Sequence, residues 1–225
     1  MCYYILMKDV AILLGGRFYK SYLKTNNENT IDLIKKKNTN FNMYLYLHIW
    51  SQDIWGNFYD KNFPKDRIII KENTSEEIEK NIKYYNPTKY IVNDVIKIND
   101  IENFTMTYEI IIFNLKTLFK MREKDYDIYI YIRADLMFKE YNLFLDNYLL
   151  KENEILCYDG GNNVPICDWI FVMNHKTIEK ICEINFESNI KIPNERNIFL
   201  NLQKHGLTFK KIGNIINNIC LKVIN

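Results

Sequence analysis

The chain has 225 residues, of which 48% are hydrophobic and 15% aromatic, and its formal net charge is +2. This length fits a single α/β domain spanning residues 1–225, and the apolar content is ample for a packed core, which excludes general disorder. The 30 basic and 28 acidic side chains are spread along the chain without a basic cluster, which argues against nucleic acid as a partner.

Cysteine usage and the N-terminal stretch indicate the compartment. The 5 cysteines form no CxxC pair and are odd in number, which favours reduced, mostly buried thiols. The apolar stretch 1–16 is interrupted by Lys8 and Asp9, and no small-residue cleavage site follows it. No apolar run reaches the ~20 residues of a membrane span. We therefore expect a cytoplasmic protein without a signal peptide or transmembrane segment.

The first half of the chain alternates apolar runs with helical patterns. The run at 9–14 is unbroken and stops at Gly15-Gly16, which is typical of a strand buried on both faces of a parallel sheet. Residues 74–77 (Thr-Ser-Glu-Glu) form a capping box that predicts a helix start, and Pro87 ends that helix. The other elements expected here are a helix at 30–37 and strands at 42–50, 67–71 and 89–93.

The second half begins with the longest predicted helix, 105–122, whose apolar residues recur at i, i+3, i+4 and i+7. Alternating Ile and Tyr then predict a strand at 127–135 that ends in charged residues. Further elements expected are strands at 154–159, 169–173 and 207–212, a helix at 175–184 with Asn174 as its cap, and a helix between Pro193 and Gly206. This order predicts βαβ units and a mostly parallel central sheet flanked by helices.

Polar residues that follow the predicted strands form the candidate site, because ligands of open α/β sheets bind beyond the carboxyl ends of the strands. Glycines let backbone amides approach phosphate, arginine grips a diphosphate, and carboxylates bind divalent cations or sugar hydroxyls. The combination indicates a ligand that carries both phosphate and sugar. The residues concerned are Gly15, Gly16, Arg17, Ser51, Gln52, Asp53, Arg133, Asp135, Asp159 and Asp168.

Structural interpretations of the same residues stay open. Gly15-Gly16 belongs to neither a GxGxxG motif nor a P-loop, and it could be a plain strand-ending turn. Asp53 could cap a helix or turn. Arg133 and Asp135 could form an ion pair along one strand. Two histidines have structural interpretations as well: His48, inside an apolar strand, is interpreted as a core residue with its hydrogen bonds satisfied, and His205 as a charge at a helix C-terminus.

Several stretches, taken in order, resemble a known family. They are VAILLGGRF (10–18), LYLHIWSQD (45–53), TYEIIIFNLKTLFKM (107–121), YDIYIYIRADLMF (126–138) and CDWIFVMNHKTIEKI (167–181). Their order resembles GT-A-fold glycosyltransferases, and more closely small proteins assigned as glycosyltransferases in large DNA viruses and some bacteria. The resemblance covers most of the chain, although each motif is short.

The resemblance implies a GT-A-like (Rossmann-like) fold and an activity. The protein would move a sugar from a nucleotide diphosphate donor, a UDP- or GDP-sugar, onto a glycan or protein-linked acceptor. This is the hexosyl- or deoxyhexosyltransferase class, EC 2.4. Two alternatives stay open: a nucleotidyltransferase or other nucleotide-binding α/β enzyme with Asp135 and Asp159 on a metal, and an inactive GT-A-like binding module.

The resemblance also implies roles for individual residues. Gly15–Arg17 would face the nucleotide diphosphate, and Asp53 would lie near the base or ribose. Asp135 would stand for the last carboxylate of the family's Asp-x-Asp motif, which usually binds Mn²⁺ or Mg²⁺. Here the first acid of that motif is replaced by Arg133. This permanent cation could neutralise part of the charge a metal normally handles, so metal dependence becomes doubtful.

The resemblance places an acid near the acceptor at Asp168. For an inverting transfer this carboxylate would be the general base that deprotonates the incoming hydroxyl. Asp159, on the other side of the same glycine–asparagine turn, is the alternative base.

Overall fold

The computed structural model describes residues 7–16, 18, 30–55, 69–94, 107–134, 136–138, 143–159, 170–186, 194–214 and 219–221. For 53–55, 69–70, 107–110, 136–138, 159, 194–195, 213–214 and 219–221 it describes the backbone alone.

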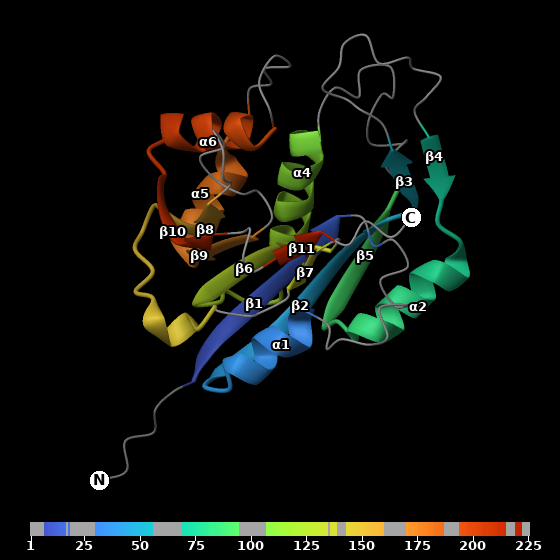
Figure 1. Cartoon of the computed structure of the whole chain (residues 1–225), viewed down its shortest axis with the longest axis horizontal. Coiled ribbons are helices and arrows are strands. Elements are labelled where there is room, and N and C mark those ends of the chain that lie inside the picture. The colour runs from blue at the N-terminus through green and yellow to red at the C-terminus, as the bar shows by residue number, and fades with distance from the viewer. Residues whose placement is uncertain are drawn as a thin grey trace.

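A seven-stranded sheet with the order β10-β8-β9-β6-β1-β2-β5 forms the centre of the described structure (Figure 1). β1 pairs in parallel with β2 and β6, β2 with β5, and β8 with β10, whereas β9 runs antiparallel to both β6 and β8. The mostly parallel sheet expected from the sequence is therefore confirmed. Its strands are β1 (Lys8–Gly16), β2 (Phe41–Trp50), β5 (Lys89–Asn93), β6 (Ile128–Arg133), β8 (Glu154–Asp159), β9 (Ile170–Asn174) and β10 (Thr208–Asn214).

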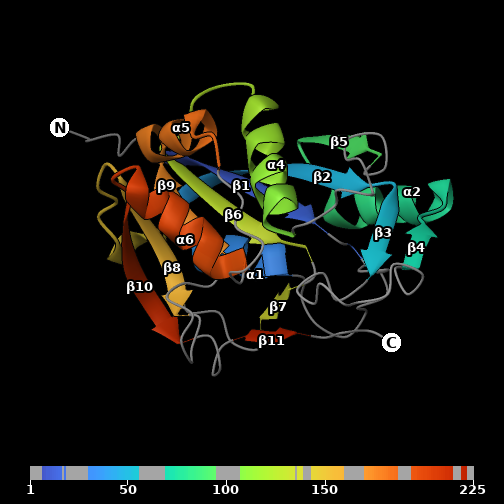
Figure 2. The ribbon, with the colours of Figure 1, turned by 90° about the horizontal axis from the view of Figure 1, so that it is seen from above.

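Helices cover both faces of the sheet, as Figure 2 shows for α1 and α4. Alternate residues of β1 point to opposite faces, and Val10 and Ala11 are both 0% exposed. Val10 belongs to the apolar cluster that includes α1 (Thr30–Lys37) and α2 (Ser75–Tyr85). Ala11 belongs to the cluster under α4 (Thr107–Lys120), α5 (His175–Glu183) and α6 (Asn194–Lys204). Among the described helices, none is long and apolar enough to cross a membrane.

The predicted helix boundaries rest on capping groups that the structure confirms. Thr74 Oγ1 accepts from the backbone N–H of Glu77, and the Glu77 carboxylate accepts in return from the N–H of Thr74. Asn174 caps α5 by accepting from the N–H of Thr177 at 2.9 Å. These bonds satisfy donors that the first turn of a helix cannot pair internally.

Two short ribbons lie outside the central sheet and differ from the sequence-based expectation. The strand predicted at 67–71 is observed as β4 (Ile69–Glu72), but it pairs antiparallel with β3 (Gln52–Trp55), an element with no predicted counterpart. The strand predicted at 127–135 ends at Arg133, and β7 (Leu136–Phe138) then pairs with β11 (Ile219–Leu221). Both pairings join segments that are separated along the chain.

Asn38 fastens the segment after β7 to the end of α1. Its amide nitrogen donates to the carbonyl oxygens of Ile34 and Leu143, both at 3.0 Å, and its oxygen accepts from the N–H of Leu145 at 2.7 Å. The side chain is only 3% exposed. Removing it would take a hydrogen-bond partner from three backbone groups.

We expect Asn38→Ala to lower the free energy of unfolding by about 2–4 kcal/mol, because it removes three hydrogen bonds and strands their buried partners. Asn40→Ala is the matched control: Asn40 is exposed and makes one 3.2 Å bond to Asp146, so its loss should change stability by less than about 0.5 kcal/mol. Urea unfolding of both variants measures the difference. Equal, small losses would show that Asn38 does not fasten this segment.

Candidate functional site

The strand order reverses at the junction of β1 and β6. From β1 the chain passes through α1 to β2 and then β5 on one side, while β6 lies on the other side of β1. In open α/β sheets, ligands bind in the crevice outside the carboxyl ends of the strands at such a switch point. The carboxyl ends of β1, β2 and β6 therefore define the candidate site.

Gly15, Gly16 and Arg133 meet at this junction, as their positions at strand ends predict. Gly15 pairs with Arg133 of β6 and with His48 of β2, and its carbonyl oxygen accepts from the N–H of Ala134 at 2.9 Å. Side chains at paired positions point to the same face. His48 and Arg133 therefore flank Gly15 on the face that α4 covers, about 10 Å apart across two strand spacings.

Both glycines have a structural reason for having no side chain. A Cβ atom on Gly15 would lie 3.2 Å from Asn114 Cβ and 3.2 Å from Leu118 Cδ1 of α4. Gly16 has φ of +117°, a conformation that side chains disfavour. Both glycines are the last residues of β1, and whether a turn or a phosphate site follows them stays open, because residue 17 lies outside the described residues.

The remaining predicted residues are described only in part. Asp159 ends β8 opposite Asn214 of β10, at the same sheet edge and about 10 Å from the end of β6, two strand spacings away. Asp53 lies inside β3, opposite Lys71. Arg17, Asp135 and Asp168 lie outside the described residues, so their predicted roles stay predictions.

The described part of the chain contains no group of three or more His, Cys, Asp or Glu side chains that could hold a metal ion. At the position where the resembling family has its first acid, this chain has the guanidinium of Arg133. A fixed positive charge repels a divalent cation. Asp135, the predicted metal ligand, lies outside the described residues, so metal binding stays a prediction.

His48 corrects an expectation from the sequence. It is a core residue, 0% exposed, but neither ring nitrogen has a hydrogen-bond partner. Trp50 and Asn114, 3% and 1% exposed, share this state: Trp50 Nε1 and Asn114 Oδ1 are also unpartnered. The ring centroids of His48 and Trp50 are 4.6 Å apart, and Phe113 lies within 5.9 Å of His48 and 5.5 Å of Trp50. We call His48, Trp50 and Asn114 the neutral cluster.

The neutral cluster is expensive to bury. Each buried polar atom that lacks a partner costs about 1–3 kcal/mol. The sequence contained a signal that was missed: Asn114 stands between Ile111 and Leu118 in the apolar stripe of α4, where a polar side chain needs a partner.

Burial keeps the imidazole uncharged. It lowers the pKa of His48 to about 4, and the nearby side chain of Asn114 offsets only part of this effect. No atom of Asn114 meets hydrogen-bond geometry with either ring nitrogen. At neutral pH the cluster therefore contributes dipoles and no charge, whereas Arg133 contributes a permanent charge on the other side of Gly15.

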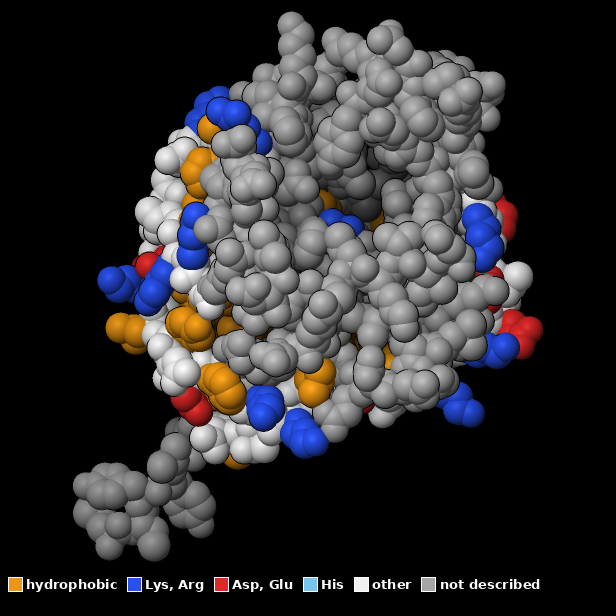
Figure 3. Space-filling view, viewed as in Figure 1, with side chains coloured by type: hydrophobic (Ala, Val, Ile, Leu, Met, Phe, Trp, Pro, Cys, Tyr) orange, Lys and Arg blue, Asp and Glu red, His pale blue; other side chains and the backbone are white. Residues whose placement is uncertain are grey.

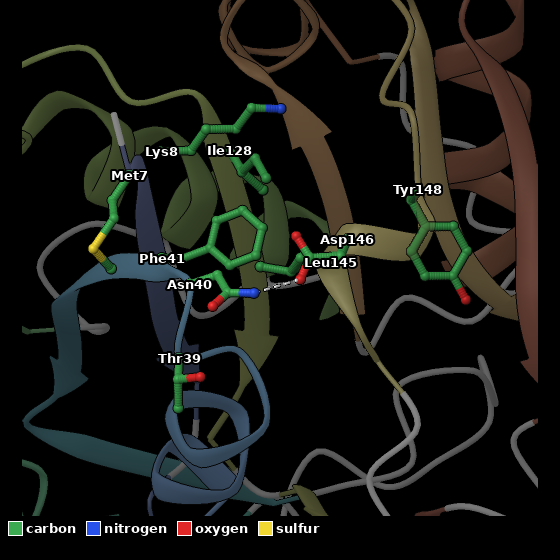
Figure 4. A pocket seen from close by; sticks show the side chains of 9 residues that line it. All are labelled: Met7, Lys8, Thr39, Asn40, Phe41, Ile128, Leu145, Asp146 and Tyr148. Atoms are coloured by element: carbon green, nitrogen blue, oxygen red, sulfur yellow. Dashed lines mark hydrogen bonds between the residues drawn. The ribbon is translucent and has the colours of Figure 1, made fainter. Parts of the chain in front are cut away.

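The amino-end edge of the sheet differs in its polar groups. There Tyr129 Oη accepts from the N–H of Tyr126 at 3.0 Å and lies 3.0 Å from His175 Nδ1. A cavity of about 510 Å³ also opens at this edge, between the starts of β1, β2 and β6 and residues 145–148 (Figure 4). None of the predicted site residues lines it.

Charged side chains are dispersed on the surface. Figure 3 shows the described basic and acidic side chains scattered around the rim of the face seen in Figure 1. This dispersal agrees with the even charge distribution of the sequence.

No protein-family model matches the sequence, and no curated protein matches it. Among solved structures, the chain is similar to the apo form of the glycosyltransferase GlyE of Streptococcus pneumoniae, with 16% identity and a TM-score of 0.46. That match covers 91% of this chain and 45% of GlyE, so the chain spans less than half of the GlyE length.

A second similar structure is the galactosyltransferase LgtC in complex with donor and acceptor sugar analogs. The identity is 12% and the TM-score 0.49, covering 89% of this chain and 72% of LgtC. Likeness of this degree assigns no activity to the chain.

The lowered pKa of His48 predicts a pH-dependent stability. Below pH 6.5 the unfolded chain binds a proton more readily than the folded protein, so stability falls as the pH drops toward about 4 and is not lost further below it. We expect the wild type to lose up to about 3 kcal/mol more than His48→Gln between pH 7 and pH 4. Urea unfolding across this range measures it; parallel curves would contradict a buried neutral imidazole.

Proposed function

We propose that the chain is a glycosyltransferase that moves a sugar from a UDP- or GDP-sugar onto a glycan or protein-linked acceptor. The observation that supports this most directly is the pairing of Gly15 with Arg133 at the strand-order switch. It puts two glycines and an arginine at neighbouring strand ends. Backbone amides and arginine are the groups that bind a diphosphate.

In this proposal the charged part of the donor binds at Gly15–Arg17 and Arg133. Arg133 is half-buried, so its charge is less screened by water than that of an exposed arginine. It stabilises the negative charge that develops on the leaving diphosphate as the glycosidic bond breaks. Asp53 lies near the base or ribose, and Asp135 contacts the sugar or a metal.

The transfer itself needs a carboxylate at the acceptor. The acceptor oxygen attacks the anomeric carbon while the bond from that carbon to the diphosphate oxygen breaks, and the diphosphate leaves with the electron pair. An alcohol is a weak nucleophile until its proton is being removed. We assign this role to Asp168, with Asp159 as the alternative base.

The replacement of the family's first acid by Arg133 favours a second candidate, an inactive module that binds nucleotide sugars. A nucleotidyltransferase would use the same edge with nucleoside triphosphates. Incubation with labelled nucleotide sugars and triphosphates separates the three, since only the first candidate transfers sugar. A thermal-shift panel of UDP, GDP and their sugars, with and without Mn²⁺, tests binding and the predicted role of Asp135 as a metal ligand.

Arg133→Gln should weaken binding of a nucleoside diphosphate by about 1.5–3 kcal/mol, the worth of a hydrogen bond to a charged group. Arg122→Gln is the matched control, because Arg122 lies at the other end of the sheet, bonded to Asp125 at 3.1 Å and stacked on Phe119. Calorimetric titration with UDP and GDP measures both. Equal affinities for the two variants would remove Arg133 from the diphosphate site.

Asp168→Asn should lower turnover about 10²–10⁴-fold while donor affinity is kept, because a general base acts on the acceptor proton. The turnover of Asp159→Asn should fall much less. Initial rates and donor titrations for both variants measure this. If Asp159→Asn is the one that loses turnover, the role moves to Asp159; if neither loses it, a retaining mechanism without such a base explains the transfer better.

A further inference from the structure

The neutral cluster lies where the proposed donor binds, yet the proposed function leaves it without a role. His48 is in register with Gly15, and Asn114 packs against Gly15 from α4. The cluster therefore adjoins this glycine on the side opposite Arg133. Three of the described residues that have unpartnered buried side-chain atoms, His48, Trp50 and Asn114, gather beside this glycine.

We infer that His48, Trp50 and Asn114 form a seat for the uncharged, hydrogen-bonding part of the ligand, and that they determine which ligands the crevice accepts. The inference rests on the proposed function. A neutral imidazole offers one donor and one acceptor, the indole a donor, and the Asn114 carbonyl an acceptor. Such a set matches a group that both donates and accepts without charge: sugar or ribose hydroxyls, or the amide edge of a base.

The charges of these residues agree with separate sites for the uncharged and the charged parts of the ligand. The buried imidazole stays neutral at physiological pH, so it adds no attraction for phosphate. Arg133, one strand away from Gly15 on the other side, carries the charge. A seat built from unpaired dipoles discriminates strongly, because a ligand that lacks the matching groups leaves those dipoles buried without partners.

Phe113 connects the seat with the surface. Its ring lies against both His48 and Trp50, and unlike them it is partly exposed. In this inference a ligand reaches the seat past Phe113.

The seat makes a prediction opposite to that of a structural role. If His48 merely supported the fold, removing its polar atoms would lower stability. If it is held unpartnered for a ligand, an apolar residue of similar shape should keep or raise stability and weaken ligand binding. The decisive variant is thus His48→Phe, with Asn114→Leu as a second apolar replacement and His48→Gln as the conservative one.

The test uses the full chain and three probes: UDP, UDP-glucose and inorganic pyrophosphate. For His48→Phe at pH 7.5 we expect an unchanged or raised Tm, a 10–100-fold loss of affinity for UDP or UDP-glucose, and unchanged affinity for pyrophosphate.

A loss already seen with UDP assigns the seat to the nucleoside; a loss confined to UDP-glucose assigns it to the sugar. His48→Gln should recover part of the affinity. His205→Phe, at the end of α6 where His205 Nδ1 lies 2.8 Å from Asn201 O, is the control and should bind like the wild type.

A lowered Tm together with unchanged UDP and UDP-glucose affinity would overturn the inference. Should His48→Phe fail to fold, the wild type decides: the imidazole ¹⁵N signals of His48 should move on addition of UDP or UDP-glucose and stay in place with pyrophosphate. The inference would also be overturned if UDP or UDP-glucose binds and the imidazole ¹⁵N signals of His48 do not move with any of the three probes. If the wild type binds no probe at all, the proposed function fails, and the inference fails with it.

Discussion

The close approach of α4 to β1 at Gly15 is the constraint on which this edge of the sheet depends. Asn114 and Leu118 occupy the space beside the glycine, each 3.2 Å from where a Cβ atom would lie. The helix can therefore cover the end of β1 while the neighbouring strands keep His48 and Arg133 on the same face. A larger residue at position 15 would have to displace α4, and with it the side-chain amide of Asn114 beside His48.

This constraint divides the candidate site into a charged and a neutral half. Arg133 lies on one side of Gly15 and His48 on the other, each in register with it. The guanidinium is always protonated, whereas burial keeps the imidazole neutral. A ligand with a diphosphate at one end and hydroxyl or amide groups at the other would match both halves at once. The division follows from the register of three strands and needs no mobile element.

Buried polar groups are paired differently at the two ends of the strands. Near the amino-end edge, Tyr129 Oη accepts from the N–H of Tyr126 and lies 3.0 Å from His175 Nδ1, and such bonds contribute to stability. At the carboxyl-end edge, His48 and Asn114 remain unpartnered at a cost the fold must offset through its two apolar clusters. Proteins depart from full hydrogen-bond satisfaction mainly at sites that serve a ligand.

The sequence by itself determined the features whose signals lie within a few residues: the helix at 30–37, the capping box at 74–77, and the strand ends that bring Gly15 and Arg133 to one edge. The reversed direction of β9, the ribbons formed by β3 and β7, and the state of His48 were decided only by the tertiary structure. Within its own strand His48 resembles any apolar core position. Its lack of partners arises from its register with a glycine and from a helix that follows much later in the chain. Periodicity within one segment carries no information about which residue of another segment will face it.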